Sequence, residues 1–157
     1  MSSVGPTALA PDVFPVKAPP ERMGRDWVPV LKEIPLFEGM SSRHLRRIPA
    51  RSKRYGDGET IVRAGDPGNA FYVVLDGTVR VDPPAGASVT LTAGDAFGEM
   101  SLLDGAPRSA DITAVGEATL MVIGRAAFTK LLRNEPQMSA VLLRTLARRL
   151  RAAQEQF

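Results

Sequence analysis

The sequence from Leu91 to Ala110 reads Leu-Thr-Ala-Gly-Asp-Ala-Phe-Gly-Glu-Met-Ser-Leu-Leu-Asp-Gly-Ala-Pro-Arg-Ser-Ala, and the interpretation of the whole chain depends on it. Gly98 has no side chain, so a backbone can approach a ligand closely there. The next residues, 99–103, are long enough for one helical turn, which Asp104-Gly105 would end. The unpaired N–H groups at the start of such a turn favour an anion. The stretch therefore predicts a phosphate site.

Two charged residues refine this hypothesis. Arg108 offers a guanidinium fork that suits phosphate oxygens, and Ser109 adds a hydroxyl donor. A carboxylate at Glu99 would be repelled by a phosphate, so it fits the site only if it accepts hydrogen bonds from a sugar hydroxyl. The alternative is that Glu99 and Arg108 simply pair with each other across the loop.

Composition limits the class of protein. The chain has 157 residues, enough for one domain with a tail, and is 44% hydrophobic and 24% charged. No apolar run approaches the roughly 18 residues of a membrane span, and the first ten residues do not resemble a secretory signal. We therefore expect a cytoplasmic protein without membrane insertion. The absence of cysteine and the single histidine, His44, argue against a thiol nucleophile and against a metal centre with thiolate or histidine ligands, and we expect no cofactor.

The formal net charge is +3 and the pI is about 9.7, which raises the hypothesis of an anionic partner such as nucleic acid. The basic residues form two runs: Arg43, Arg46, Arg47, Arg51, Lys53 and Arg54, and then Arg144, Arg148, Arg149 and Arg151. Solvated helix faces with snorkelling side chains are the favoured explanation of both runs.

The N-terminal part divides in two. Residues 1–25 are rich in proline and predict a disordered or extended tail. Residues 26–50 predict short helices: Trp27, Val30, Leu31 and Ile34 have helical spacing before Pro35, and Ser41 or Ser42 can cap a second helix that Pro49 ends. His44 lies in that second helix, where we expect a surface or packing role.

Residues 51–124 change to strand-like patterns. The β-rich runs are Glu59–Arg63, Phe71–Leu75, Thr78–Val81, Ser88–Thr92, Ser109–Ala114 and Ala118–Ile123. Asp76-Gly77 between two of these runs predicts a hairpin turn. Many short strands with glycine turns predict a mainly β fold with flanking α, a β-roll or jelly-roll barrel with short N-terminal helices and a long C-terminal helix.

Residues 125–157 return to helical spacing. Phe128, Leu131 and Leu132 share a face, and the chain breaks at Asn134-Glu135-Pro136. The last helix, about 137–154, carries one leucine stripe and one arginine stripe. We expect the barrel or a partner to cover one face.

These motifs together resemble the cyclic nucleotide-binding domain family, which includes catabolite activators and protein kinase A regulatory subunits. The resemblance covers about 36–150, and its most specific part is Phe97-Gly98-Glu99-Met100-Ser101-Leu102-Leu103 followed by Pro107-Arg108-Ser109-Ala110. It implies a β-roll with flanking helices and a cassette, 94–110, that binds cyclic nucleotide.

The resemblance also implies a role for individual residues. Glu99 would hold the ribose 2′-hydroxyl, Arg108 and Ser109 the cyclic phosphate, and Gly98 and Ser101 would act through backbone amides. The binding site as a whole would consist of Phe97, Gly98, Glu99, Met100, Ser101, Arg108, Ser109 and Ala110. Gln154 could reach the edge of the base, although a solvated terminal side chain is the alternative. None of these roles is catalytic.

The expected function is a regulatory sensor that is not an enzyme. Its ligand would be cAMP, with cGMP also allowed, and its signal would pass through residues 137–154 to a partner protein or a homodimer. The chain ends soon after the last helix, with no room for a helix-turn-helix, so we do not expect DNA binding. The alternative is a ligand-independent scaffold that keeps the same fold.

Overall fold

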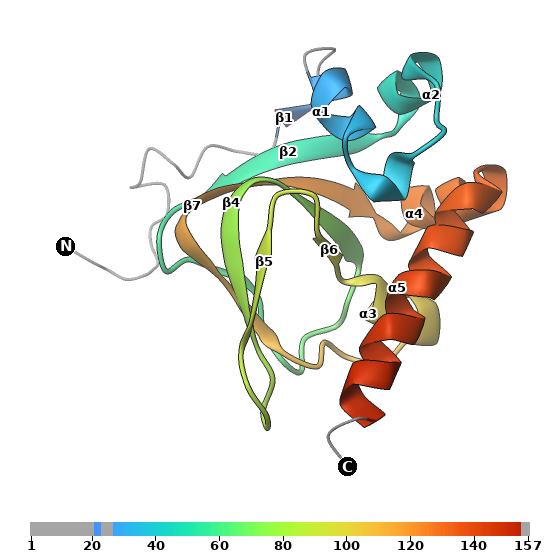
Figure 1. Ribbon diagram of the computed structural model, residues 1–157. Coiled ribbons are helices and arrows are strands. Elements are labelled where there is room, and N and C mark those ends of the chain that lie inside the picture. The colour runs from blue at the N-terminus through green and yellow to red at the C-terminus, as the bar shows by residue number, and fades with distance from the viewer. Residues whose placement is uncertain (1–20, 23–26, 155–157) are drawn as a thin grey trace. The chain divides into compact units, whose positions relative to one another are not determined.

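Two long strands, β4 (Ala70–Asp82) and β7 (Asp111–Gly124), are the framework of the computed structural model, which describes residues 21–22 and 27–154 (Figure 1). The shorter strands are β1 (Glu21–Arg22), β2 (Ala50–Tyr55), β3 (Thr60–Val62), β5 (Val89–Thr92) and β6 (Ala96–Phe97). β7 pairs with β2, β3 and β4, and β4 also pairs with β5 and β6. Every pairing is antiparallel, so the expected mainly β fold, a β-roll with helices including a C-terminal helix, is confirmed.

The chain separates into two compact units. The sheet unit contains β1 and Pro49–Arg125, and the helical unit contains the described parts of Gly24–Ile48 and Ala126–Phe157. The helical unit therefore combines segments from both ends of the sequence.

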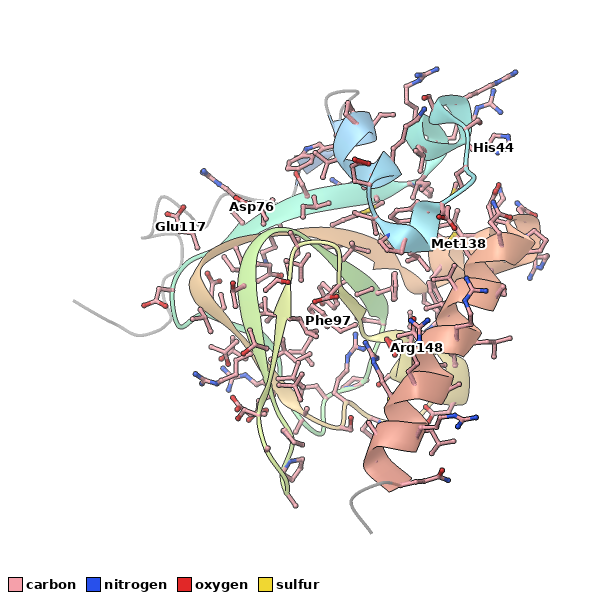
Figure 2. All side chains as sticks on the ribbon, viewed as in Figure 1. His44, Asp76, Phe97, Glu117, Met138 and Arg148 are labelled. Carbon is pink, nitrogen blue, oxygen red and sulfur yellow. The ribbon has the colours of Figure 1, made fainter. Side chains whose placement is uncertain are left out.

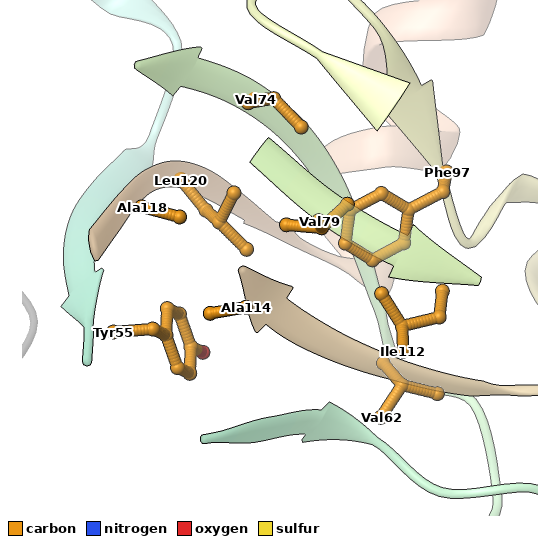
Figure 3. Packing of buried hydrophobic residues seen from close by; sticks show 9 residues of the cluster. All are labelled: Tyr55, Val62, Val74, Val79, Phe97, Ile112, Ala114, Ala118 and Leu120. Atoms are coloured by element: carbon orange, nitrogen blue, oxygen red, sulfur yellow. The ribbon is translucent and has the colours of Figure 1, made fainter. Parts of the chain in front are cut away.

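The core of the sheet unit consists of buried side chains from five of its strands. Val74 and Val79 of β4 lie with Ala114 and Leu120 of β7 in one buried cluster (Figure 3). Tyr55, Val62, Phe97, Ile112 and Ala118 complete this cluster. Because Phe97 immediately precedes Gly98, the hydrophobic core anchors one end of the predicted binding cassette.

The predicted hairpin turn at Asp76-Gly77 is wrong. Both residues lie inside the continuous strand β4, where the register with β7 shifts on each side of Asp76. Gly77 has φ +90°. Glycine adopts a positive φ in β-bulges as well as in hairpin turns, so the residue type alone does not distinguish the two. The residues before and after Gly77 pair with β7 rather than with each other, which the local pattern could not reveal.

The last two predicted strands are likewise one strand, β7, with an exposed irregularity around Gly116. Asp76 and Glu117 lie close together where β4 and β7 depart from regular pairing (Figure 2). The Gly116 N–H donates to the Asp57 carboxylate at 2.7 Å, which holds this bend.

Two further strands depart from the sequence-based expectation. The sequence pattern does not predict β2, because Arg51, Lys53 and Arg54 of this strand belong to the first basic run and indicate only a charged surface. Glu21–Arg22 lies in the predicted tail but pairs with Arg51 and Ser52 of β2, since an extended segment can satisfy the backbone groups at the edge of a strand. The rest of the predicted tail lies outside the described residues.

The helical unit begins with α1 (Val28–Lys32), the 3₁₀ helix η3 (Pro35–Phe37) and α2 (Ser42–Arg47). Proline lies in the first turn of α1 and of η3, where its missing N–H costs nothing. The hydroxyl of Ser41 accepts from the His44 N–H at 3.2 Å, which confirms the predicted cap.

The same unit ends with α4 (Arg125–Asn134), whose first residue Arg125 still belongs to the sheet unit, and α5 (Pro136–Gln154). α5 packs against η3 and buries Met138 and Leu142. His44 Nδ1 lies 3.4 Å from the Glu135 carboxylate, between α4 and α5, so the only histidine joins two segments of the helical unit at its surface. Among the described helices, none is long and apolar enough to cross a membrane.

The bulge in β4 generates a stability prediction. A Cβ at Gly77 would lie 2.3 Å from the Glu117 carbonyl oxygen, whereas a Cβ at Gly86 would meet no atom closer than 3.9 Å, although both glycines have positive φ. Gly77→Ala should therefore lower the free energy of unfolding by about 3 kcal/mol or more, from strain plus overlap, and Gly86→Ala by only about 1 kcal/mol, from strain. Urea unfolding of both variants measures the difference, and equal losses would contradict a bulge that needs glycine.

Candidate functional site

The cassette is built around the short helix α3 (Glu99–Asp104), which lies between two glycines with positive φ. Gly98 precedes the helix with φ +95°, and Gly105 ends it with φ +74°. The predicted helical turn and its glycine ends are therefore confirmed. These backbone conformations are strained for residues that carry a Cβ, so the two glycines fix where α3 starts and stops.

Gly98 is also tightly surrounded. A Cβ there would lie 3.0 Å from the Ala70 carbonyl oxygen and 3.0 Å from Nη1 of Arg108. The missing side chain thus lets the backbone before α3 approach the guanidinium of Arg108. The predicted close approach of backbone at Gly98 is present, although in this structure the group that approaches is an arginine of the same chain.

Arg108 is the central cation of the site. It is only 8% exposed, and its guanidinium donates from Nη1 to the Gly98 carbonyl at 3.0 Å and from Nη2 to the Ala70 carbonyl at 2.7 Å. Burial lowers the pKa of Arg108, while Tyr72 and Glu99 act in the opposite direction. An arginine remains protonated under such conditions, so the site holds a buried positive charge.

The backbone of Arg108 is held as firmly as its side chain. Its N–H donates to the Asp66 carbonyl at 2.8 Å, and its carbonyl accepts from the Gly65 N–H at 2.8 Å. These reciprocal bonds tie the loop before β4 to the loop before β7. The position of Arg108 in the site therefore depends on Gly65 and Asp66, which are distant from it in sequence.

Gly68 closes the same loop against the cassette. A Cβ at this position would lie 2.3 Å from Cβ of Ser101 and 3.0 Å from Cζ of Arg108. Ser101 is itself buried, at 5% exposure. A side chain at this position would overlap Ser101, so glycine lets the loop backbone pack directly against both Ser101 and Arg108.

An aromatic pair supports the arginine. The rings of Tyr72 and Phe97 stack with their centroids 4.9 Å apart, and the Arg108 guanidinium lies 5.8 Å from the centroid of Tyr72. Burial raises the pKa of Tyr72, and the charge of Arg108 lowers it. The phenol therefore stays neutral near neutral pH, and its ring acts as an apolar support that still attracts a cation.

Glu99 is the first residue of α3 and is 2% exposed, so a second charged group is buried in the cassette. It interacts electrostatically with Arg108. Burying a carboxylate and a guanidinium is costly unless each has partners, which makes this pair of charges the most informative feature of the site.

The structure brings together Gly98, Glu99, Ser101 and Arg108 among the residues predicted for the site. Phe97 and Ala110 are buried beside them, whereas Met100, at 52% exposure, and Ser109 lie at the surface. Gln154 is exposed and belongs to the helical unit. Its contact with a base, like each role assigned from the family resemblance, stays a prediction.

Sequence reasoning missed three residues of the site: Gly68, Tyr72 and Arg125. Tyr72 has the spacing of an ordinary core residue in β4, and Gly68 looked like part of a turn. Arg125 donates from Nη2 to the Gly68 carbonyl, a contact that no local pattern indicates.

The arrangement offers binding groups rather than reactive ones. A buried guanidinium with several N–H donors can hold an anion, and a buried carboxylate can accept hydrogen bonds from hydroxyl groups. Within the described residues, no group of three or more His, Cys, Asp or Glu side chains could hold a metal ion.

Comparison with known proteins agrees with this geometry. The family described as "Cyclic nucleotide-binding domain" matches residues 52–135. The chain is 38% identical to Glutaminase 1 of Bradyrhizobium diazoefficiens over 76% of its own length and 20% of that protein. It is 35% identical to the CRP-like cAMP-activated global transcriptional regulator of Mycobacterium tuberculosis over 78% of its own length and 58% of that protein.

A solved structure described as "Sp-2Cl-cAMPS bound to PKAR CBD2" superimposes with a TM-score of 0.73 at 27% identity. The match covers 84% of this chain and 90% of that one. The chain thus spans only a fifth to three fifths of the two relatives named above but nearly all of this structure. The family match covers more than half of the chain and contains the whole cassette, so this chain belongs to the cyclic nucleotide-binding domain family.

Proposed function

We propose that this chain binds cAMP in the cassette formed by α3 and Arg108 and that it acts as a regulatory sensor. The observation that carries the proposal is the burial of one cation and one carboxylate, Arg108 and Glu99, in the same small site. A cyclic nucleotide offers a complementary pair of groups, a phosphate anion and a ribose 2′-hydroxyl.

Arg108 holds the cyclic phosphate. Two of the five N–H groups of its guanidinium donate to backbone carbonyls, which fixes the orientation of the fork. The remaining donors serve the phosphate oxygens, each charge-assisted bond contributing about 1.5–3 kcal/mol. The orientation is set before the ligand arrives, so less side-chain entropy is lost on binding.

Glu99 holds the ribose. A carboxylate next to a phosphate would weaken binding, so Glu99 must face the sugar, where the 2′-hydroxyl can donate to it. Its burial makes such a bond stronger than the same bond in water. Gly98 and Ser101 add backbone amides, and Ser109 adds its exposed hydroxyl.

We propose cAMP in preference to cGMP, and two relatives support this choice, since one is named as cAMP-activated and the solved structure is described as having Sp-2Cl-cAMPS bound. We propose a regulatory role for this domain and assign no catalytic step to it. Any catalytic activity of a larger protein would belong to other parts of that protein.

The output of the sensor is assigned to α5. Leu143 and Leu150 are seven residues apart on this helix and are 67% and 60% exposed. Leu146 lies between them at the spacing of a coiled-coil seam, so a second copy of α5 would cover an apolar stripe. The ligand can shift the equilibrium between two positions of α5 only if it binds more tightly to the protein in one position than in the other.

The proposal predicts a large loss of affinity in Arg108→Ala. Removing the buried partner of the phosphate should weaken cAMP binding by about 100-fold or more. Isothermal titration of wild-type protein, at about 50 µM, should detect cAMP binding that is tighter than cGMP binding. Arg63→Ala, which removes an exposed arginine of the same unit, should bind like wild type. Absence of binding by the wild type with either nucleotide would instead support a ligand-independent scaffold.

A second prediction isolates Glu99 with a modified ligand. If Glu99 accepts from the 2′-hydroxyl, wild type should prefer cAMP over 2′-deoxy-cAMP by about tenfold or more, and Glu99→Gln should bring this ratio toward about one. The ratio cancels any effect of the substitution that is common to both ligands. Glu117→Gln, on the distant bend of β7, should keep the wild-type ratio. An unchanged ratio in Glu99→Gln would contradict the ribose assignment.

A third prediction concerns self-association through α5. Wild type should be dimeric at about 100 µM in sedimentation equilibrium, and Leu143→Glu with Leu150→Glu should make it monomeric, because charges would enter the apolar stripe. Val89→Glu changes another exposed apolar residue, on β5, and should leave the dimer intact. A monomeric wild type would remove the homodimer and leave a different partner protein as the target of α5.

A further inference from the structure

Arg125 is a cation that the proposed ligand contacts do not use. It follows the last residue of β7 and is the first residue of α4, and its side chain is exposed. Its Nη2 nevertheless donates to the Gly68 carbonyl, and its backbone N–H donates to the Asn69 carbonyl at 3.1 Å. Two bonds from one residue therefore hold two successive peptide groups.

The other side of Gly68 faces the cassette. Its Cα lies so close to Ser101 and Arg108 that a Cβ would overlap Ser101 at 2.3 Å and approach Cζ of Arg108 to 3.0 Å. A displacement of the Gly68 peptide of a few tenths of an ångström would change both contacts. The position of the Gly68 backbone is thus coupled to the positions of Ser101 and of the Arg108 guanidinium.

We propose that Arg125 is a positioning residue of the cyclic phosphate site, which holds the Gly68 peptide by its carbonyl and so fixes Ser101 and Arg108 for the ligand. This inference rests on the proposed function, since it adds a residue to the same site. Arg125 itself does not touch the ligand in this assignment.

Electrostatics adds a second contribution that the test must separate from the first. The charge of Arg125 disfavours the charged form of Arg108, although burial is the main cause of the lowered pKa of Arg108. An anion bound near both guanidinium groups would be attracted by each of them. A purely electrostatic contribution is screened by salt, whereas a geometric one is not.

The variants are matched in length. Arg125→Met removes the donor and the charge, Arg125→Lys retains both, and Lys130→Met makes the same kind of change at an exposed position of α4. We expect cAMP affinity to fall by about tenfold in Arg125→Met and to stay within about threefold of wild type in Arg125→Lys and Lys130→Met. Affinity within threefold of wild type in Arg125→Met would overturn the proposal.

Salt separates the two contributions. At about 1 M NaCl the screening length is only about 3 Å, so a defect caused by lost charge should disappear. The defect of Arg125→Met relative to wild type should persist at this salt concentration if Arg125 acts through the position of Gly68. Its disappearance would overturn the positioning role and leave a charge effect.

A measurement without ligand keeps this inference distinct from the proposed function. In ¹H–¹⁵N spectra, the amide of Ser101 and the Nε–H of Arg108 should shift in Arg125→Met but not in Lys130→Met. Unchanged signals would overturn the proposal even if cAMP binds to the wild type. If the signals shift but wild type binds neither cAMP nor cGMP, the effect of Arg125 on the cassette is supported and the proposed cyclic nucleotide ligand is contradicted.

Discussion

The buried guanidinium of Arg108 is the interaction on which the cassette depends. A cation at 8% exposure is tolerated because two backbone carbonyls, an aromatic ring and a nearby carboxylate replace part of its hydration. The carbonyls belong to Gly98 and Ala70, which lie on different segments of the chain. One side chain thus connects the start of α3 with the start of β4, and each segment needs the other to keep this charge buried.

This constraint explains the glycines of the site. Gly98 lets the backbone before α3 reach the guanidinium, and Gly68 lets the loop before β4 pack directly against Ser101 and Arg108. Both positions lack room for a Cβ, but only Gly98 also requires a positive φ. The cassette is therefore specified by close packing of backbone as much as by its charged groups.

The sheet makes these contacts possible by pairing distant segments. β4 and β7 run antiparallel along most of their lengths, with Ala70 opposite Gly124 and Asp82 opposite Asp111. The beginning of β4 therefore lies beside the end of β7, which brings Gly68 and Asn69 to Arg125. The bulge at Gly77 and the bend at Gly116 allow both strands to remain continuous, so the pairing of β4 with β7 continues on both sides of the bulge although its register shifts there.

The sequence by itself determined the mainly β fold, the turn of helix after Gly98, its end at Gly105, and the presence of Glu99 and Arg108 in one cassette, because these features depend on local residue order. Tertiary structure alone decided that Asp76-Gly77 forms a bulge, since both halves of β4 pair with a strand more than thirty residues away. It also decided that Gly68, Tyr72 and Arg125 belong with the cassette. Their signals were ambiguous because a turn glycine, a strand aromatic and a surface arginine acquire their roles only from the distant atoms that they contact.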